Sequence, residues 1–67
     1  MSQCIEYRRA NGGAGSERFG DASQYRAAVR ALLREHAERG HVIESVHGQV
    51  EVRDRIGNRI ATYWFVD

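Results

Sequence analysis

Three arginines spaced four residues apart are the first residues whose type and position suggest a chemical role. On a helix, Arg26, Arg30 and Arg34 form one row about 12 Å long. No acidic residue lies within one turn of Arg26 or Arg30, whereas Glu38 can pair with Arg34. This arginine row is therefore either a solvated helix face or a contact surface for an acidic partner, which would be a phosphate backbone or a carboxylate-rich protein surface.

Two glutamates face each other across a predicted hairpin. The two-residue turn His47-Gly48 sets Glu44 directly opposite Glu51. Paired carboxylates can serve acid–base catalysis, but like charges that face each other across strands are usually solvated and bridged by a cation, here Arg53 or another basic residue. We therefore expect Glu44, Glu51 and Arg53 to belong to a binding surface and not to a catalytic site.

The remaining candidates for chemistry lack the spacing that their chemistry requires. The three histidines and Cys4 form neither a Cys-x-x-Cys nor a helical His-x-x-x-His pair, which zinc sites use. No serine lies in a nucleophile-elbow signature. The glycines between Asn11 and Gly20 lack the Gly-Lys-Ser/Thr ending of a phosphate-binding loop. We therefore predict a protein that is not an enzyme and that has no metal and no cofactor.

The helix that must carry the arginine row is the most regular element of the chain. Asp21 can cap its first turn with Gln24 as the second member of a capping box, and Gly40 can end it. Between these residues, an apolar stripe recurs at three- and four-residue steps and requires a core. Its members are Ala22, Tyr25, Ala28, Val29, Leu32, Leu33 and His36.

Strands are predicted on both sides of this helix. Cys4–Arg8 alternates in the manner of a strand, and Asn11–Gly20, with four glycines, is predicted to be a mobile loop. Val42–Val46 and Gln49–Arg53 form the hairpin, and Ile60–Val66 returns as a strand after a turn. The result is a small two-layer β-α-β-β domain of the α+β class, an antiparallel sheet with one helix packed on one face.

Alternation along these strands assigns their side chains to two faces. For a connecting loop of two or four residues before the last strand, the helix side carries Val50, Val52, Ala61, Tyr63 and Phe65. The opposite side carries Val42, Val46, Ile60, Thr62 and Trp64 among Glu44, Glu51 and Arg53. An exposed tryptophan with arginine and glutamate neighbours is typical of a binding hot spot. The alternative is that the N-terminal segment, the glycine-rich loop or a second copy of the chain covers this face.

Length and composition limit the possibilities further. Residues 1–67 form a single domain near the lower size limit for one core, so dimerisation or a partner would help it. The net charge is +1, and therefore any electrostatic attraction must come from a patch. The single Cys4 excludes an internal disulfide, and no long apolar run is present. We expect a monomer or homodimer in the cytoplasm of a host bacterial cell, without membrane contact.

One stretch carries a resemblance to a known family. The run Gly-His-Val-Ile-Glu-Ser-Val-His-Gly, residues 40–48, resembles part of a family of small phage-encoded anti-CRISPR proteins that inhibit a type I surveillance complex. The likeness covers less than half of the chain, which departs from the family pattern by having no lysine and by its glycine-rich loop. The resemblance implies a stoichiometric inhibitor that docks on a protein–RNA complex and obstructs guide–target pairing; it implies no site residues.

Two hypotheses follow. The first is a protein-binding inhibitor or adaptor from a phage or mobile element, which docks on a CRISPR effector complex through the sheet face around Trp64, either alone or together with the arginine row. The alternative is a small nucleic-acid-binding accessory protein or regulator that contacts phosphates through the arginine row, helped by Arg8 and Arg9. The affinity of such a protein for nucleic acid should fall steeply with salt.

Overall fold

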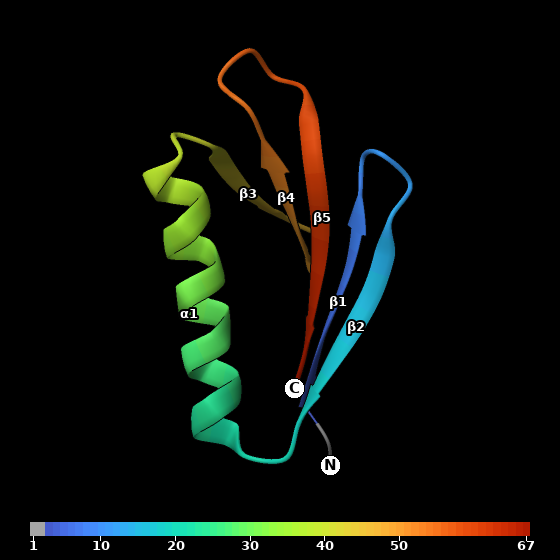
Figure 1. Cartoon of the computed structure of the whole chain (residues 1–67), viewed down its shortest axis with the longest axis vertical. Helices are drawn as coiled ribbons and strands as arrows, with labels where there is room; N and C mark the ends of the chain where they lie inside the picture. Colours follow the sequence, from blue (N-terminus) through green and yellow to red (C-terminus); the bar gives the residue numbers. More distant parts are fainter. Residues whose placement is uncertain (1–2) are drawn as a thin grey trace.

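Five strands form one sheet and a single helix packs on it. The computed structural model describes residues 3–67. Its elements are β1 (Gln3–Arg9), β2 (Ala14–Phe19), α1 (Ala22–Glu38), β3 (Val42–Val46), β4 (Gln49–Arg53) and β5 (Arg59–Val66). The strand order is β2-β1-β5-β4-β3, with every neighbouring pair antiparallel, and α1 lies against one face (Figure 1). No helix among the described residues is long and apolar enough to cross a membrane.

The predicted α+β class, with one helix on an antiparallel sheet, is confirmed. The three strands predicted after the helix, Val42–Val46, Gln49–Arg53 and Ile60–Val66, are all present, one more than the label β-α-β-β counts. What the prediction lacks is β2, which lies before the helix. The predicted first strand corresponds to β1, which lies between β2 and β5 and pairs with both.

Both ends of α1 are closed by local hydrogen bonds. Asp21 is the N-cap, and its carboxylate accepts from the backbone N–H of Ser23 at 2.8 Å and from the Ser23 hydroxyl at 2.9 Å. At the other end Gly40 has φ +78°, and the N–H of His41 donates to the carbonyl of His36 at 3.0 Å. Glycine enters this left-handed conformation without steric cost, so the chain reverses there and leads directly into β3.

The core lies between α1 and the central strands. Its buried residues are Ile5, Tyr25, Val52, Ala61 and Tyr63. Most of the predicted helix stripe faces this core, although its first member, Ala22, is exposed. Three residues predicted for the core are only half-buried and pack around it, namely Leu32, Val50 and Phe65.

The glycine-rich segment predicted to be a mobile loop is mostly strand β2, so that prediction is wrong. A short turn precedes the strand, in which the Asn11 side chain accepts from the N–H of Gly13 at 2.9 Å. Tyr7 on β1 pairs with Gly15 on β2, and a Cβ at Gly15 would lie 2.5 Å from the Tyr7 hydroxyl oxygen. The glycine that suggests a loop therefore makes room for an aromatic ring from the neighbouring strand.

The predicted register of the β3–β4 hairpin is confirmed. Val46 pairs with Gln49 and Glu44 with Glu51, as the two-residue turn requires. His47 has φ +48° and Gly48 has φ +79°, so both turn residues are left-handed, as in a type I′ turn. This turn type matches the twist of the two strands and thereby fixes which side chains share a face.

The connection from β4 to β5 differs from the predicted two or four residues. Five residues, 54–58, separate the paired residues Arg53 and Arg59. The register then shifts by one, so that Val52 pairs with Ala61 and Ile60 is the extra residue of a β-bulge. Because of this bulge, Ala61 and Tyr63 lie opposite Val52 and Val50 although the connecting loop has an odd number of residues. Ala61, Tyr63 and Phe65 therefore face the helix, as predicted. Ile60 itself was predicted for the opposite face, but it packs against the core because the bulge turns it inward.

We predict that Val52→Ala lowers the free energy of unfolding by about 2 kcal/mol, because Val52 is completely buried and its methyl groups would leave a cavity. The matched control is Val42→Ala, the same change at a strand residue that is 48% exposed, with an expected loss below about 0.5 kcal/mol. Urea unfolding followed by circular dichroism measures both. Equal losses would contradict the assignment of the two sheet faces.

Candidate functional site

α1 lies against one face of the sheet and leaves the other face uncovered (Figure 1). This uncovered face, here called the outer face, carries four of the predicted binding residues. The strand registers place Glu44 opposite Glu51, and Trp64 opposite Glu6 of β1. Arg53 lies two residues beyond Glu51 on the same face. Across β1, β5, β4 and β3 this face consists of Cys4, Glu6, Arg8, Val42, Glu44, Val46, Gln49, Glu51, Arg53, Thr62, Trp64 and Val66.

Trp64 is half-buried on the outer face. Because β5 lies between β1 and β4, Trp64 is flanked by a strand on each side and is not at an edge. Val42, at the start of the edge strand β3, and Val66, at the end of the central strand β5, are 48% and 44% exposed and add apolar surface to the same face. The outer face therefore combines a central, half-buried aromatic ring with exposed valines and charged residues around it.

Charge on the outer face is only partly compensated. Arg53 donates to the Glu51 carboxylate at 3.1 Å and to the carbonyl oxygen of Gly57 at 3.1 Å. Arg53 therefore pairs with Glu51 alone, and the predicted bridge between the two glutamates is not present among residues 3–67. Glu44, in contrast, makes no ion pair among residues 3–67, although it faces Glu51 directly. A negative charge thus remains at the β3 side of the outer face.

The arginine row lies on a different side of the molecule. Arg26, Arg30 and Arg34 are all exposed, and none of them has an ion-pair partner within the described part of the chain. The predicted pair between Glu38 and Arg34 is therefore absent. Since the row lies on α1 and α1 covers the inner face of the sheet, the structure does not bring the row together with Trp64, Glu44, Glu51 and Arg53. One flat partner surface cannot contact both groups at once.

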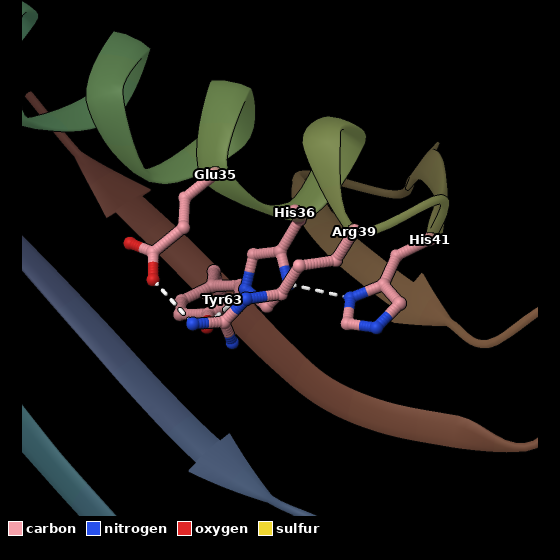
Figure 2. Close-up of polar contacts among 5 residues, drawn as sticks. All are labelled: Glu35, His36, Arg39, His41 and Tyr63. Carbon is pink, nitrogen blue, oxygen red and sulfur yellow. Dashed lines mark hydrogen bonds and ion pairs between the residues drawn. The ribbon is translucent and has the colours of Figure 1, made fainter.

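A buried polar cluster was missed by the sequence analysis (Figure 2). His36, in the last turn of α1, has its Nε2 atom 2.9 Å from the hydroxyl of Tyr63 on β5 and its Nδ1 atom 2.9 Å from Nδ1 of His41. Beside it, Arg39 donates to the Glu35 carboxylate at 2.7 Å. The signal in the sequence was the glycine stop, because the reversal after α1 returns His41 to the side of His36.

The geometry of this cluster limits its protonation. Two Nδ1 atoms at hydrogen-bond distance share one proton, so one imidazole donates and the other accepts. Burial lowers the pKa of His36, and the positive charges of His41 and Arg39 lower it further. Burial also raises the pKa of the Tyr63 hydroxyl. His36 is therefore neutral at pH 7, with both ring nitrogens engaged and neither free to act on a ligand in the adjacent cavity of about 240 Å³.

His36 and His41 do not recruit further metal ligands. No group of three histidine, cysteine, aspartate or glutamate side chains that could hold a metal ion occurs among residues 3–67. His47 lies in the β3–β4 turn, as predicted.

Comparisons with protein-family models, with curated proteins and with solved structures found no match for the chain.

We predict that the free energy of unfolding falls as the pH drops below about 6.5. The pKa of His36 is below its ordinary value of 6.5 in the folded state, so the unfolded chain binds more protons between the two pKa values. Stability is thus complete above pH 6.5 and decreases until the folded-state pKa is reached. Hydrogen bonds from Ser23 lower the pKa of Asp21 below its ordinary value of 3.8. Asp21 therefore affects the free energy of unfolding only below about pH 3.8.

Urea unfolding between pH 7.5 and 5 measures this slope. In His36→Gln the slope should become shallower, because the buried titrating group is gone. His47→Asn is the control, since His47 is exposed and asparagine tolerates its left-handed conformation. An unchanged slope in His36→Gln would show that the pH dependence has another origin.

Proposed function

We propose that this chain is a non-enzymatic binding protein that docks on a protein partner through the outer face, with Trp64 as the central contact. The observation that carries this proposal is the uncovered sheet face itself. A half-buried tryptophan, exposed valines and an uncompensated glutamate lie there together. Central aromatic residues surrounded by polar ones supply most of the binding energy in protein interfaces.

The size of the chain fits this role. A standard protein–protein interface buries about 800 Å² on each partner, which is about a sixth of the 4808 Å² accessible surface of this chain. The outer face is formed by neighbouring strands of one continuous sheet. Such a protein acts by occupying a surface of its target and excluding other ligands from it.

For the partner we propose a CRISPR effector complex of type I, so that the chain would be a stoichiometric anti-CRISPR-type inhibitor from a phage or mobile element. The support is the resemblance of residues 40–48, which include β3. Three of these residues, Val42, Glu44 and Val46, lie on the outer face. The resemblance and the proposed docking surface therefore meet in the same strand.

A nucleic-acid-binding role is the second candidate, favoured by one observation. Arg26, Arg30 and Arg34 are exposed and free of ion pairs within residues 3–67. Guanidinium groups in a row can contact successive phosphates, and counterion release would then make binding strongly dependent on salt. The two candidates use opposite sides of the molecule and are separable by mutation.

We predict that Trp64→Ala weakens binding to a purified type I effector complex by about 2 kcal/mol or more, because a central aromatic contact is removed. The control is Ile56→Ala, which removes an 83% exposed apolar side chain from the β4–β5 loop and should leave affinity unchanged. Calorimetric titration measures both. In the wild-type protein, the emission of this single tryptophan should shift to the blue on binding. Equal affinity of both variants would refute the outer face as the docking surface.

Arg30→Glu tests the second candidate. If the outer face is the docking surface, the variant keeps its affinity for the effector complex, and its stability is nearly unchanged because exposed charges contribute little. If the arginine row contacts phosphates, the variant loses affinity for nucleic acid and the salt dependence becomes shallower by about one counterion. Binding measured across a salt series distinguishes the two results.

A further inference from the structure

We propose that the free edge of β3 accepts an extended segment of the partner as a sixth strand, and that this segment carries a basic residue opposite Glu44. The inference rests on the proposed function, since it names the chemistry of the partner segment that a protein-binding role requires. It is carried by three observations on β3: an unprotected edge, outward-pointing backbone groups and an uncompensated charge.

The sheet has two edges, β2 and β3, and they differ in protection. β2 carries Glu17 and Arg18 and contains Gly15. Charges and interruptions of this kind discourage pairing with another strand. β3 has the sequence Val-Ile-Glu-Ser-Val, without a basic residue or proline, and the register shift within residues 3–67 lies between β4 and β5. β3 is therefore the edge that is open to strand addition.

The hairpin turn determines which backbone groups of β3 are free. In a hairpin with a two-residue turn, the residues next to the turn form a hydrogen-bonded pair, here Val46 with Gln49. Alternation then directs the N–H and C=O groups of Ile43 and Ser45 away from β4. No hydrogen bond outside the β3–β4 ladder uses these groups among residues 3–67. Ser45 is exposed, so α1 does not cover this part of the edge.

Side chains on the outer face of β3 define what the added strand must present. Val42 and Val46 flank Glu44, and all three point to the same side. Glu44 lacks a cation within the described part of the chain, whereas its neighbour Glu51 has Arg53. A residue on an added strand would lie about 5 Å from Glu44. A basic residue there supplies the missing counter-charge, and apolar residues two positions to each side match the valines.

The same geometry argues against a second copy of this chain as the occupant. Only one two-fold antiparallel arrangement uses the outward groups of both Ile43 and Ser45 reciprocally, with Ile43 of one copy paired with Ser45 of the other. This arrangement places Glu44 directly against Glu44 of the second copy. Like charges that face each other across strands are destabilising. A different chain with the order apolar-x-basic-x-apolar avoids this repulsion.

The test uses the full chain and a matched pair of peptides, Thr-Val-Thr-Arg-Thr-Val-Thr and the same peptide with glutamate in place of arginine. Binding is followed by NMR up to millimolar peptide. We expect the arginine peptide to bind about fivefold more tightly, with slowed amide exchange at Ile43 and Ser45 but not along β2. In Glu44→Arg the preference should reverse, whereas Glu38→Arg, the same change on an exposed position of α1, should keep the wild-type preference.

Three results would overturn the proposal: no binding of either peptide, equal binding of both peptides, or a concentration-dependent dimer of the chain, whether or not Glu44→Arg abolishes that dimer. The spectrum of each variant shows whether it is folded. If Glu44→Arg leaves the peptide preference unchanged while Trp64→Ala abolishes binding to the effector complex, the edge proposal is overturned and the proposed function is kept. Selective peptide binding without effector binding would keep the edge proposal and overturn the effector complex as the partner.

Discussion

The pairing of β1 with β5 is the interaction on which the rest of the fold depends. It joins two local units, the β1–β2 hairpin and the β3–β4–β5 meander, into one sheet. Two strands alone are only marginally stable in water, whereas a sheet of three or more strands with a buried apolar face can be stable by itself. Three of the five core residues, Ile5, Ala61 and Tyr63, lie on these two strands. The core therefore forms only when the ends of the described chain meet.

The second constraint is that one helix cannot cover five strands. Strands lie about 4.8 Å apart, so the outer strands of this sheet are roughly 19 Å from each other, whereas a helix is about 10 Å wide. The helix covers the middle of the inner face and leaves the outer face open (Figure 1). A chain this small thus keeps Trp64 partly exposed. The proposed role as a binding protein builds on this geometry.

The ends of the helix and the register of the β3–β4 hairpin depend on residues close together in the sequence, and both were predicted from it. Asp21 and Gly40 marked the ends of α1, and His47-Gly48 fixed the β3–β4 register, which placed Glu44 opposite Glu51. The failures have physical causes that lie elsewhere in the chain. Gly15 indicated a loop because the tyrosine that needs its space is on another strand. The His36–Tyr63 contact joins residues 27 positions apart, and no sequence spacing reveals such a pair.

The β1–β5 pairing also has a consequence for how the chain folds. Tyr7 pairs with Tyr63, 56 residues further along (63 − 7). The hairpins form early because their strands are near in sequence. The β1–β5 pair forms later, because β5 must first be synthesised and the long segment between the two strands must close into a loop. Until then β1 exposes Ile5 and an unpaired edge to other chains. Folding is therefore expected to be slow for so short a protein, roughly milliseconds to seconds by analogy with other sheets of non-local pairing. Its intermediate is the state most exposed to aggregation.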